Sequence, residues 1–335
     1  MNIVILGSGG WGTALANLLA GNGHNVALWS FSKDECENLK KTGENPLLKG
    51  IALHKNIEFT NAFDAVCNAQ MVVFATPSFA IRATAEKVRE DRPEQCVLVS
   101  VTKGIEAGTS QRMSQIIENV TGRTVAVLSG PSHAEEVGRG VPTGCVAACA
   151  VKEVAELVQD TFMCDHFRVY STDDVVGVEL GAALKNVIAL CAGVSDGMGC
   201  GDNTKALLMT RGLTEIARLG LALGSRKETF AGLTGVGDLI VTCTSMHSRN
   251  RRAGILIGQG KTPEEAMKEV GAVVEGFYAA KSAWELAQKT GVNMPITREA
   301  YGVLYEGKKP AEALSVLMTR RKQRELEDAG WENYQ

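Results

Sequence analysis

The feature that most constrains this chain is a glycine-rich turn close to its start. A short apolar run, 3–6, leads directly into Gly7-Ser8-Gly9-Gly10-Trp11-Gly12, and the helix-like stretch Thr13–Ala20 follows. This is a G-x-G-x-x-G pattern between a strand and a helix, where Gly7 permits a tight turn, Gly9 lets the backbone approach a pyrophosphate, and Gly12 allows close helix packing. The helix N-terminus offers N–H groups and a positive dipole to phosphates. The pattern predicts a dinucleotide site; the alternative is a glycine turn without a ligand.

The remaining pattern predicts two domains, which suits a length of 335 residues. Residues 1–173 alternate between apolar, β-branched runs and helix-like stretches, which favours a doubly wound, Rossmann-like α/β fold with a parallel sheet. Its expected strands are Ile3–Leu6, Val26–Trp29, Met71–Ala75, Val97–Val101, Val125–Leu128 and Gly144–Ala150, and its expected helices include Thr13–Ala20, Ala80–Glu90 and Ser110–Asn119. Residues 174–335 are predicted to form an all-α domain, with helices at Val175–Ala192, Lys205–Leu223, Arg252–Gly258, Thr262–Glu269, Gly276–Lys289, Ile296–Tyr305 and Pro310–Met318 and a charged tail from Arg320 to Gln335.

Composition excludes several classes of protein. A net charge of −3 provides no basic field for nucleic acid. The nine cysteines form no CxxC pair and the five histidines no HxxxH pattern, so we expect reduced thiols in a cytoplasmic protein and no metal. The apolar stretch Val175–Ala192 is interrupted by Glu179, Lys185 and Asn186, which favours a buried helix over a membrane span.

The tip of the second strand bears on the choice of nicotinamide cofactor. An acid that bonds the ribose 2′-hydroxyl is expected there, but the sequence reads Trp29-Ser30-Phe31-Ser32-Lys33, with Asp34 and Glu35 only afterwards. Ser32 to Glu35 has the pattern of a capping box that opens a helix. Without an acid at the tip, a 2′-phosphate is not repelled, and Ser30, Ser32 or Lys33 could bind it. This favours NADPH, with NADH left open.

Two polar segments follow apolar strands, where ligands bind in open α/β sheets. Lys103 comes just after the strand ending at Val101; the alternative is a solvated loop lysine. The turn Gly130-Pro131-Ser132 exposes backbone N–H groups and a hydroxyl. His133 beside it is more simply a surface or packing histidine.

A lysine also stands inside the apolar helix Val175–Ala192. Burying an unpaired ammonium group is very costly, so Lys185 should face a cavity, a partner or a substrate. Desolvation and nearby positive charge would lower its pKa toward the range useful for proton transfer. The alternative is a structural ion pair with Glu179.

A fourth polar segment, Ser248-Arg249-Asn250-Arg251, suits a phosphate group. The parallel N–H groups of an arginine guanidinium match the spacing of phosphate oxygens, and the turn adds hydroxyl and amide donors. The alternative is a solvated helix start.

In order and spacing, these segments together resemble the NAD(P)-dependent glycerol-3-phosphate dehydrogenase family of bacterial type, from Gly7 to about Ile296. The resemblance rests on GSGGWGTALA, ATPS (Ala75–Ser78), VTKGIE, SGPSHAEE, VELGAALKN, TGVGDLIVTCT, SRNR, VVEG (Val273–Gly276) and MPI (Met294–Ile296). It implies an enzyme that interconverts dihydroxyacetone phosphate and sn-glycerol 3-phosphate with NAD(P)H. It further implies a cytoplasmic homodimer that supplies phospholipid synthesis.

The resemblance also implies roles for residues. Lys185 matches the proton donor and acceptor, Lys103 the lysine that polarises the substrate carbonyl, and Asp238 the acid that orients the lysine region. Matches to further substrate contacts are Gly130, Ser132, Asn186, Thr242, Ser248, Arg249 and Asn250. Matches to cofactor contacts, with the glycine turn, are Gly10, Trp11, Lys103, Ala134, Arg249, Val273 and Glu275, and Ser30 and Phe31 at the tip of the second strand are further candidates.

The sequence departs from the family pattern at a few positions. Gly10 stands where serine is common, His133 where phenylalanine is common, and Ser30-Phe31 where an arginine often follows the strand-two tryptophan. Two other functions stay open: a two-domain dehydrogenase acting on a hydroxy acid or hydroxyacyl thioester, and a dinucleotide sensor without catalysis.

Overall fold

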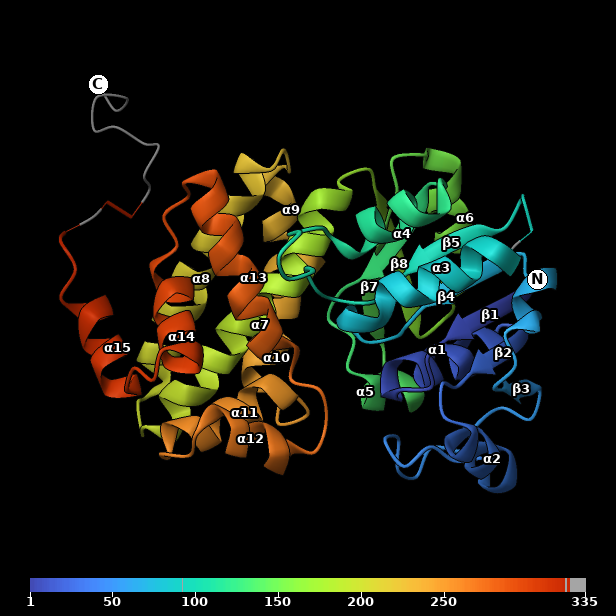
Figure 1. Ribbon diagram of the computed structural model, residues 1–335, viewed down its shortest axis with the longest axis horizontal. Helices are drawn as coiled ribbons and strands as arrows, with labels where there is room; N and C mark the ends of the chain where they lie inside the picture. The colour runs from blue at the N-terminus through green and yellow to red at the C-terminus, as the bar shows by residue number, and fades with distance from the viewer. Residues whose placement is uncertain (92, 323, 326–335) are drawn as a thin grey trace.

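The computed structural model describes residues 1–91, 93–322 and 324–325, and Figure 1 shows a sheet-containing part beside a helical part. The first part holds an eight-stranded sheet of order β3-β2-β1-β4-β5-β6-β7-β8. Its strands are β1 (Asn2–Leu6), β2 (Asn25–Trp29), β3 (Ile57–Thr60), β4 (Met71–Phe74), β5 (Val97–Ser100), β6 (Val125–Ser129), β7 (Thr143–Ala148) and β8 (Phe167–Thr172). The doubly wound fold with a mainly parallel sheet is confirmed, and the one antiparallel pair among the named strands is β6 with β7.

Helices cover both faces of this sheet. Along β1, Ile3 and Ile5 pack into one apolar cluster, which includes residues of α1 and α6, while Val4 and Leu6 pack into another with α3 and α4. This alternation explains why the strand reads as a continuous apolar run. The helical segments of this part are α1 (Gly10–Gly21), α2 (Lys33–Thr42), η1 (Asp64–Asn68), η2 (Ser78–Ala80), α3 (Ile81–Asp91), α4 (Met113–Thr121), α5 (Ala134–Gly138) and α6 (Lys152–Phe162).

Sequence reasoning missed the two edge strands, β3 and β8. β8 alternates between buried and exposed residues along most of its length, and only Ile57 of β3 is fully buried. An edge strand is covered less completely than a central one, so it lacks the continuous apolar run that marked the others.

The second part is helical and is organised around α7 (Val175–Gly197). The most apolar 18-residue window of α7 has a mean hydropathy of 1.7, so the helix is long and apolar enough to cross a membrane, yet 83% of that window is buried inside the protein. The prediction of a buried helix is confirmed. Around it lie α8 (Asp202–Ala222), α9 (Lys227–Ala231), the π-helical turn η3 (Leu233–Gly237), α10 (Asp238–Thr244), α11 (Arg249–Gly258), α12 (Pro263–Val270), α13 (Glu275–Thr290), α14 (Pro295–Tyr305) and α15 (Pro310–Met318).

Helices α7 and α11 pack backbone to backbone through glycines. A Cβ at Gly193 would lie 2.1 Å from the carbonyl oxygen of Arg251, and one at Gly254 would lie 2.1 Å from that of Leu190. No larger side chain fits at these crossings. The close contact fixes the start of α11 beside α7.

A buried carboxylate ties α7 to the sheet-containing part. Glu179, 4% exposed, accepts hydrogen bonds from the backbone N–H and hydroxyl of Ser114 at 2.8 and 2.6 Å and pairs with Arg112.

Glu179→Ala should lower the free energy of unfolding by about 3 kcal/mol, because it leaves a half-buried guanidinium and a buried hydroxyl without their acceptor. Chemical denaturation measures this, with the exposed Glu264→Ala as control; equal stabilities of the two variants would contradict it.

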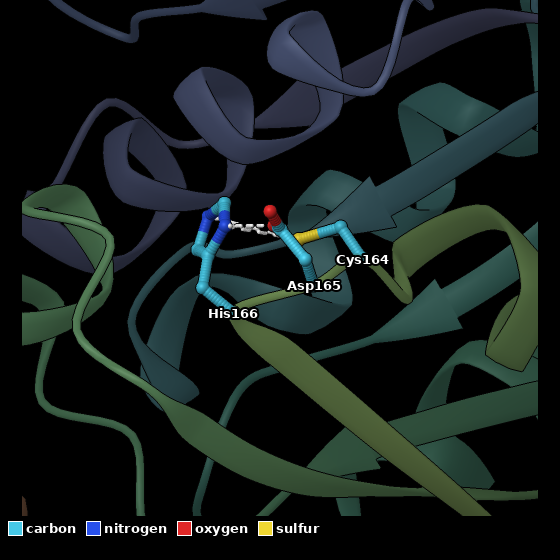
Figure 2. A group of neighbouring side chains, drawn as sticks. All are labelled: Cys164, Asp165 and His166. Carbon is cyan, nitrogen blue, oxygen red and sulfur yellow. Dashed lines mark hydrogen bonds and ion pairs between the residues drawn. The ribbon is translucent and has the colours of Figure 1, made fainter.

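Three consecutive residues with metal-ligating side chains form the turn before β8 (Figure 2). Asp165 Oδ1 lies 2.7 Å from His166 Nδ1, and Cys164 Sγ lies 3.5 and 3.6 Å from the two ring nitrogens. If Cys164 Sγ and one ring nitrogen of His166 bound the same metal ion, the other ring nitrogen would point away from the ion and would lie clearly farther from the sulfur. The two sulfur–nitrogen distances are instead nearly equal. The contacts therefore describe a hydrogen-bonded turn.

Candidate active site

Two lysines and one aspartate meet where the two parts of the protein join. Lys103 follows β5, Lys185 lies in α7, and Asp238 is the first residue of α10. Lys103 Nζ donates to Asp238 Oδ2 at 2.9 Å and to the carbonyl of Gly130 at 3.0 Å. Lys185 Nζ donates to Asp238 Oδ1, and to Thr242 Oγ1 at 2.8 Å. One carboxylate therefore holds both ammonium groups, whereas the family resemblance implied only that Asp238 orients the lysine region.

Burial sets the proton affinity of this group. Lys185 is 5% exposed and Asp238 is 1% exposed. Desolvation lowers the pKa of Lys185 to about 7, and the charge of Lys103 acts in the same direction, while Asp238 opposes both. Burial alone would raise the pKa of Asp238, but the two lysines outweigh it and hold that pKa below its ordinary value. Lys185 can therefore release and regain a proton near neutral pH.

The alternative ion pair between Lys185 and Glu179 was wrong. Glu179 pairs with Arg112, and the Lys185 ammonium points to Asp238. Lys185 and Glu179 are six residues apart, so they face different sides of α7.

A π-helical turn brings Asp238 to the lysines. η3 ends at Gly237, directly before α10, and a Cβ at Gly235 would lie 1.9 Å from the carbonyl oxygen of Phe230. Only glycine fits there, and such turns are frequent at functional sites. One turn further along α10, the hydroxyl of Thr242 donates to the backbone carbonyl of Asp238 at 2.6 Å and accepts from Lys185. Sequence reasoning did not predict α10.

The start of α11 presents polar groups beside this centre. Ser248 caps the helix, because its hydroxyl accepts from the N–H of Arg251 at 3.2 Å. Arg251 itself turns away to Asp196. Arg249 is exposed and makes no ion pair among the described residues. The helix start expected as the alternative is therefore present, and it leaves one guanidinium available for an anion.

A chain of amides fixes Asn250. Its Oδ1 accepts from the N–H of Gly276 at 2.8 Å, and its Nδ2 donates to Asn186 Oδ1 at 2.9 Å. Both asparagines are buried. Asn186, expected to contact substrate, thus also holds Asn250 in one orientation. Ser132 donates to the carbonyl of Gly130 at 3.0 Å, the same carbonyl that accepts from Lys103.

The glycine turn has the shape that a dinucleotide requires. Gly7 has φ of +124°, and a Cβ at Gly12 would lie 2.0 Å from the carbonyl oxygen of Gly7. At Gly9, which caps α1 without a side-chain bond, a Cβ would meet nothing within 4 Å. The helix N-terminus is thus open to an anion. Nearby, the buried Nε1 of Trp11 has no partner among the described residues. These residues fit a bound pyrophosphate.

Other cofactor candidates lie around this turn. A Cβ at Gly10 would contact that of Ala134, so the start of α5 adjoins the turn. Glu275, two residues after Val273, accepts from the hydroxyl and N–H of Ser78 at 2.8 and 3.4 Å, and its burial raises its pKa. Ser78 belongs to the ATPS segment but was given no role. Its place just after β4, at the carboxyl edge of the sheet, is the signal that could have marked it.

His133 fits the packing interpretation. Its ring Nε2 lies 3.4 Å from the carbonyl of Val241, and burial lowers its pKa.

The tip of β2 differs from expectation. Ser30 is fully buried, and its hydroxyl donates to Glu35 Oε2 at 2.9 Å. Ser32 does cap α2 by accepting from the N–H of Glu35, but the carboxylate of Glu35 turns to the strand tip instead of completing a capping box. The expectation that no acid reaches this tip was wrong. Phe31 is 81% exposed.

Comparisons with known proteins agree across the chain. Residues 2–155 match the family described as the N-terminus of NAD-dependent glycerol-3-phosphate dehydrogenase, and residues 174–315 match its C-terminus. A glycerol-3-phosphate dehydrogenase (NAD(P)+) of Thermoanaerobacter sp. (strain X514) is 54% identical, covering 97% of this chain and 99% of the relative. One from Fusobacterium nucleatum is 52% identical over 98% of this chain and 99% of the relative.

A solved structure extends the agreement to the fold. The crystal structure of glycerol-3-phosphate dehydrogenase from Coxiella burnetii superposes with a TM-score of 0.92 at 35% identity, covering 95% of this chain and 98% of the other. The chain therefore belongs to the family of NAD(P)-dependent glycerol-3-phosphate dehydrogenases.

Proposed function

We propose that this dehydrogenase interconverts dihydroxyacetone phosphate and sn-glycerol 3-phosphate, with Lys185 as the proton donor and acceptor. The observation that carries the proposal is the pair of lysines on one carboxylate, in which Lys185 and Asp238 are buried and Lys103 is half-buried. A buried lysine whose pKa is lowered to about 7 is suited to proton transfer near neutral pH. A protein that only binds a dinucleotide has no need for such a group.

The substrate phosphate is held at the start of α11. Arg249 supplies an exposed guanidinium, and Asn250 an amide fixed by Asn186 and Gly276. Gly130 and Ser132 lie next to Lys103, because the carbonyl of Gly130 accepts from both side chains. Anchoring the phosphate places the C2 carbonyl at the two lysines, so that much of the catalysis is orientation.

The glycine turn with Gly7, Gly9 and Gly12 would hold the dinucleotide pyrophosphate, and Trp11, Ala134 and Glu275 would border it. When bound, the reduced dinucleotide supplies the hydride that C2 receives.

The two lysines stabilise and neutralise the negative charge that develops on the substrate oxygen. Lys103 stays paired with Asp238 and stabilises that charge. Lys185 gives a proton from Nζ to the oxygen, which leaves a neutral amine beside Thr242. In the oxidative direction, neutral Lys185 takes the proton from the hydroxyl of glycerol 3-phosphate. Because its two oxygens accept from both lysines, Asp238 keeps both ammonium groups beside the substrate oxygen.

A lowered lysine pKa predicts opposite pH profiles in the two directions. Above a pH of about 7, Lys185 loses its proton. The kcat/KM for dihydroxyacetone phosphate should therefore fall as pH rises through this value, and that for glycerol 3-phosphate should rise, because kcat/KM reports ionisations of the free enzyme. Initial rates between pH 5.5 and 9 measure both. Parallel profiles in the two directions would contradict the assignment of Lys185.

We further propose a cytoplasmic homodimer that supplies glycerol 3-phosphate for phospholipid synthesis, with domains divided at residues 173 and 174. The nine cysteines are free thiols, as is usual in a reducing compartment. The division is supported by the end of β8 at Thr172 and the start of α7 at Val175. The dimer is supported by the family resemblance, and light scattering during size-exclusion chromatography tests it.

A further inference from the structure

We propose that Glu35 makes this enzyme prefer NADH to NADPH, because it sets a carboxylate where the 2′ position of the adenosine ribose is recognised. The inference rests on the proposed function in so far as the cofactor is a nicotinamide dinucleotide held by the glycine turn. It reverses the preference for NADPH that the sequence of the strand tip favours.

Ser30 stands where dinucleotide-binding folds place their ribose-binding acid. That acid follows the glycine motif by about 20 residues, at the end of the second strand, and Ser30 is the first residue after β2. A serine cannot supply the carboxylate. Its hydroxyl instead donates to Glu35 Oε2 at 2.9 Å, so the acid reaches the same strand tip from the first turn of α2.

Several contacts hold Glu35 in this place. Its N–H donates to the hydroxyl of Ser32 at 3.3 Å, which fixes its backbone at the helix start. The hydroxyl of Ser8, inside the glycine turn, donates to that of Ser30 at 2.9 Å. A relay of hydrogen bonds thus joins the turn, the strand tip and the carboxylate. Glu35 is half-buried, whereas its neighbours Lys33 and Asp34 are exposed.

The negative charge of Glu35 is not neutralised by a cation. Glu35 forms no ion pair among the described residues, and of the lysines in α2, Lys40 pairs with Glu37. Recognition of a 2′-phosphate usually uses an arginine at the strand tip. Here the residue after Ser30 is Phe31, 81% exposed, which offers an apolar ring and no charge.

These features distinguish the two cofactors by charge. The ribose 2′-hydroxyl of NADH can donate to the carboxylate of Glu35, a charge-assisted hydrogen bond. The 2′-phosphate of NADPH brings like charge to the same point, and the exposed Lys33 makes no ion pair with Glu35 that would offset the repulsion. The preference is therefore for NADH, and Glu35 acts as a specificity-determining residue.

The test compares Glu35→Gln with Glu37→Gln. Both remove one negative charge from α2, but Glu37 is exposed, pairs with Lys40 and, two residues after Glu35, faces the other side of the helix. We expect the wild-type enzyme to show a kcat/KM for NADH at least about tenfold above that for NADPH. Glu35→Gln should reduce this ratio about tenfold or more, chiefly by improving NADPH, and Glu37→Gln should leave it unchanged. Ser30→Ala, which frees the carboxylate, should shift the ratio in the same direction as Glu35→Gln.

Dissociation constants for NADH and NADPH, from nucleotide fluorescence without substrate, give a readout independent of turnover. They should show the same preference, and thermal melting confirms that each variant is folded. The proposal is overturned if wild type binds NADPH as well as NADH, or if Glu35→Gln and Glu37→Gln have the same ratio. If dihydroxyacetone phosphate is not reduced with either nucleotide, the proposed function fails, while the binding ratio still tests Glu35.

Discussion

Replacing Lys185 by methionine should lower kcat by about three orders of magnitude while cofactor binding persists. General acid–base catalysis contributes typically about 10²- to 10⁴-fold, and Lys185 is the only proton donor that the proposed mechanism uses. Methionine keeps the unbranched shape of the side chain, so α7 should still pack. Asp238 retains its ion pair with Lys103, so no buried carboxylate is left unpaired.

The measurement is steady-state turnover of dihydroxyacetone phosphate together with nucleotide binding by fluorescence. Lys281→Met is the matched control, because this lysine is exposed on α13 and lies outside the proposed machinery. A Lys185→Met enzyme with a kcat within tenfold of wild type would rule out Lys185 as the proton donor. Loss of nucleotide binding along with turnover would show a structural role instead.

Arg249→Ala should raise the KM for dihydroxyacetone phosphate about 10- to 100-fold, with a smaller change in kcat. A hydrogen bond to a charged group contributes about 1.5–3 kcal/mol, and each 1.4 kcal/mol corresponds to a factor of ten. Arg249 is exposed, so its truncation should leave stability nearly unchanged.

Two comparisons sharpen this prediction. Arg252→Ala removes an exposed arginine from the same helix and should leave KM unchanged. Dihydroxyacetone without its phosphate should be turned over equally poorly by wild type and Arg249→Ala, since the arginine then has nothing to bind. A similar loss on both substrates would show that Arg249 acts elsewhere.

The segments that sequence analysis located best are those with a strong local cause. The glycine turn lies between β1 and α1 as expected, and α12 begins at Pro263, one residue after the predicted start, with Thr262 as its cap. Each of these patterns is set by neighbouring residues alone. The buried helix α7 was also predicted, although it extends five residues beyond the predicted end.

Contacts between distant segments could not be predicted in this way. The bond between Lys103 and Asp238 joins residues 135 positions apart, and nothing local to either one indicates it. Contacts of a side chain can be unpredictable even at short range. The pattern Ser32 to Glu35 predicted that the backbone of Glu35 belongs to a helix start, but it did not predict that the side chain turns to Ser30. The reversal of β7 against β6 likewise depends on the path of the chain around α5 and leaves no mark in an apolar strand.

The shared carboxylate of Asp238 has a consequence for how activity can be lost. Its two oxygens accept hydrogen bonds from lysines on opposite sides of the proposed domain boundary at residue 173, one after β5 and one in α7. Neither half of the chain contains all of the proposed proton-transfer centre, so on this proposal activity requires that the two halves dock correctly and not only that each of them folds. If the two halves separated partly, the enzyme would lose its activity although both halves kept their secondary structure.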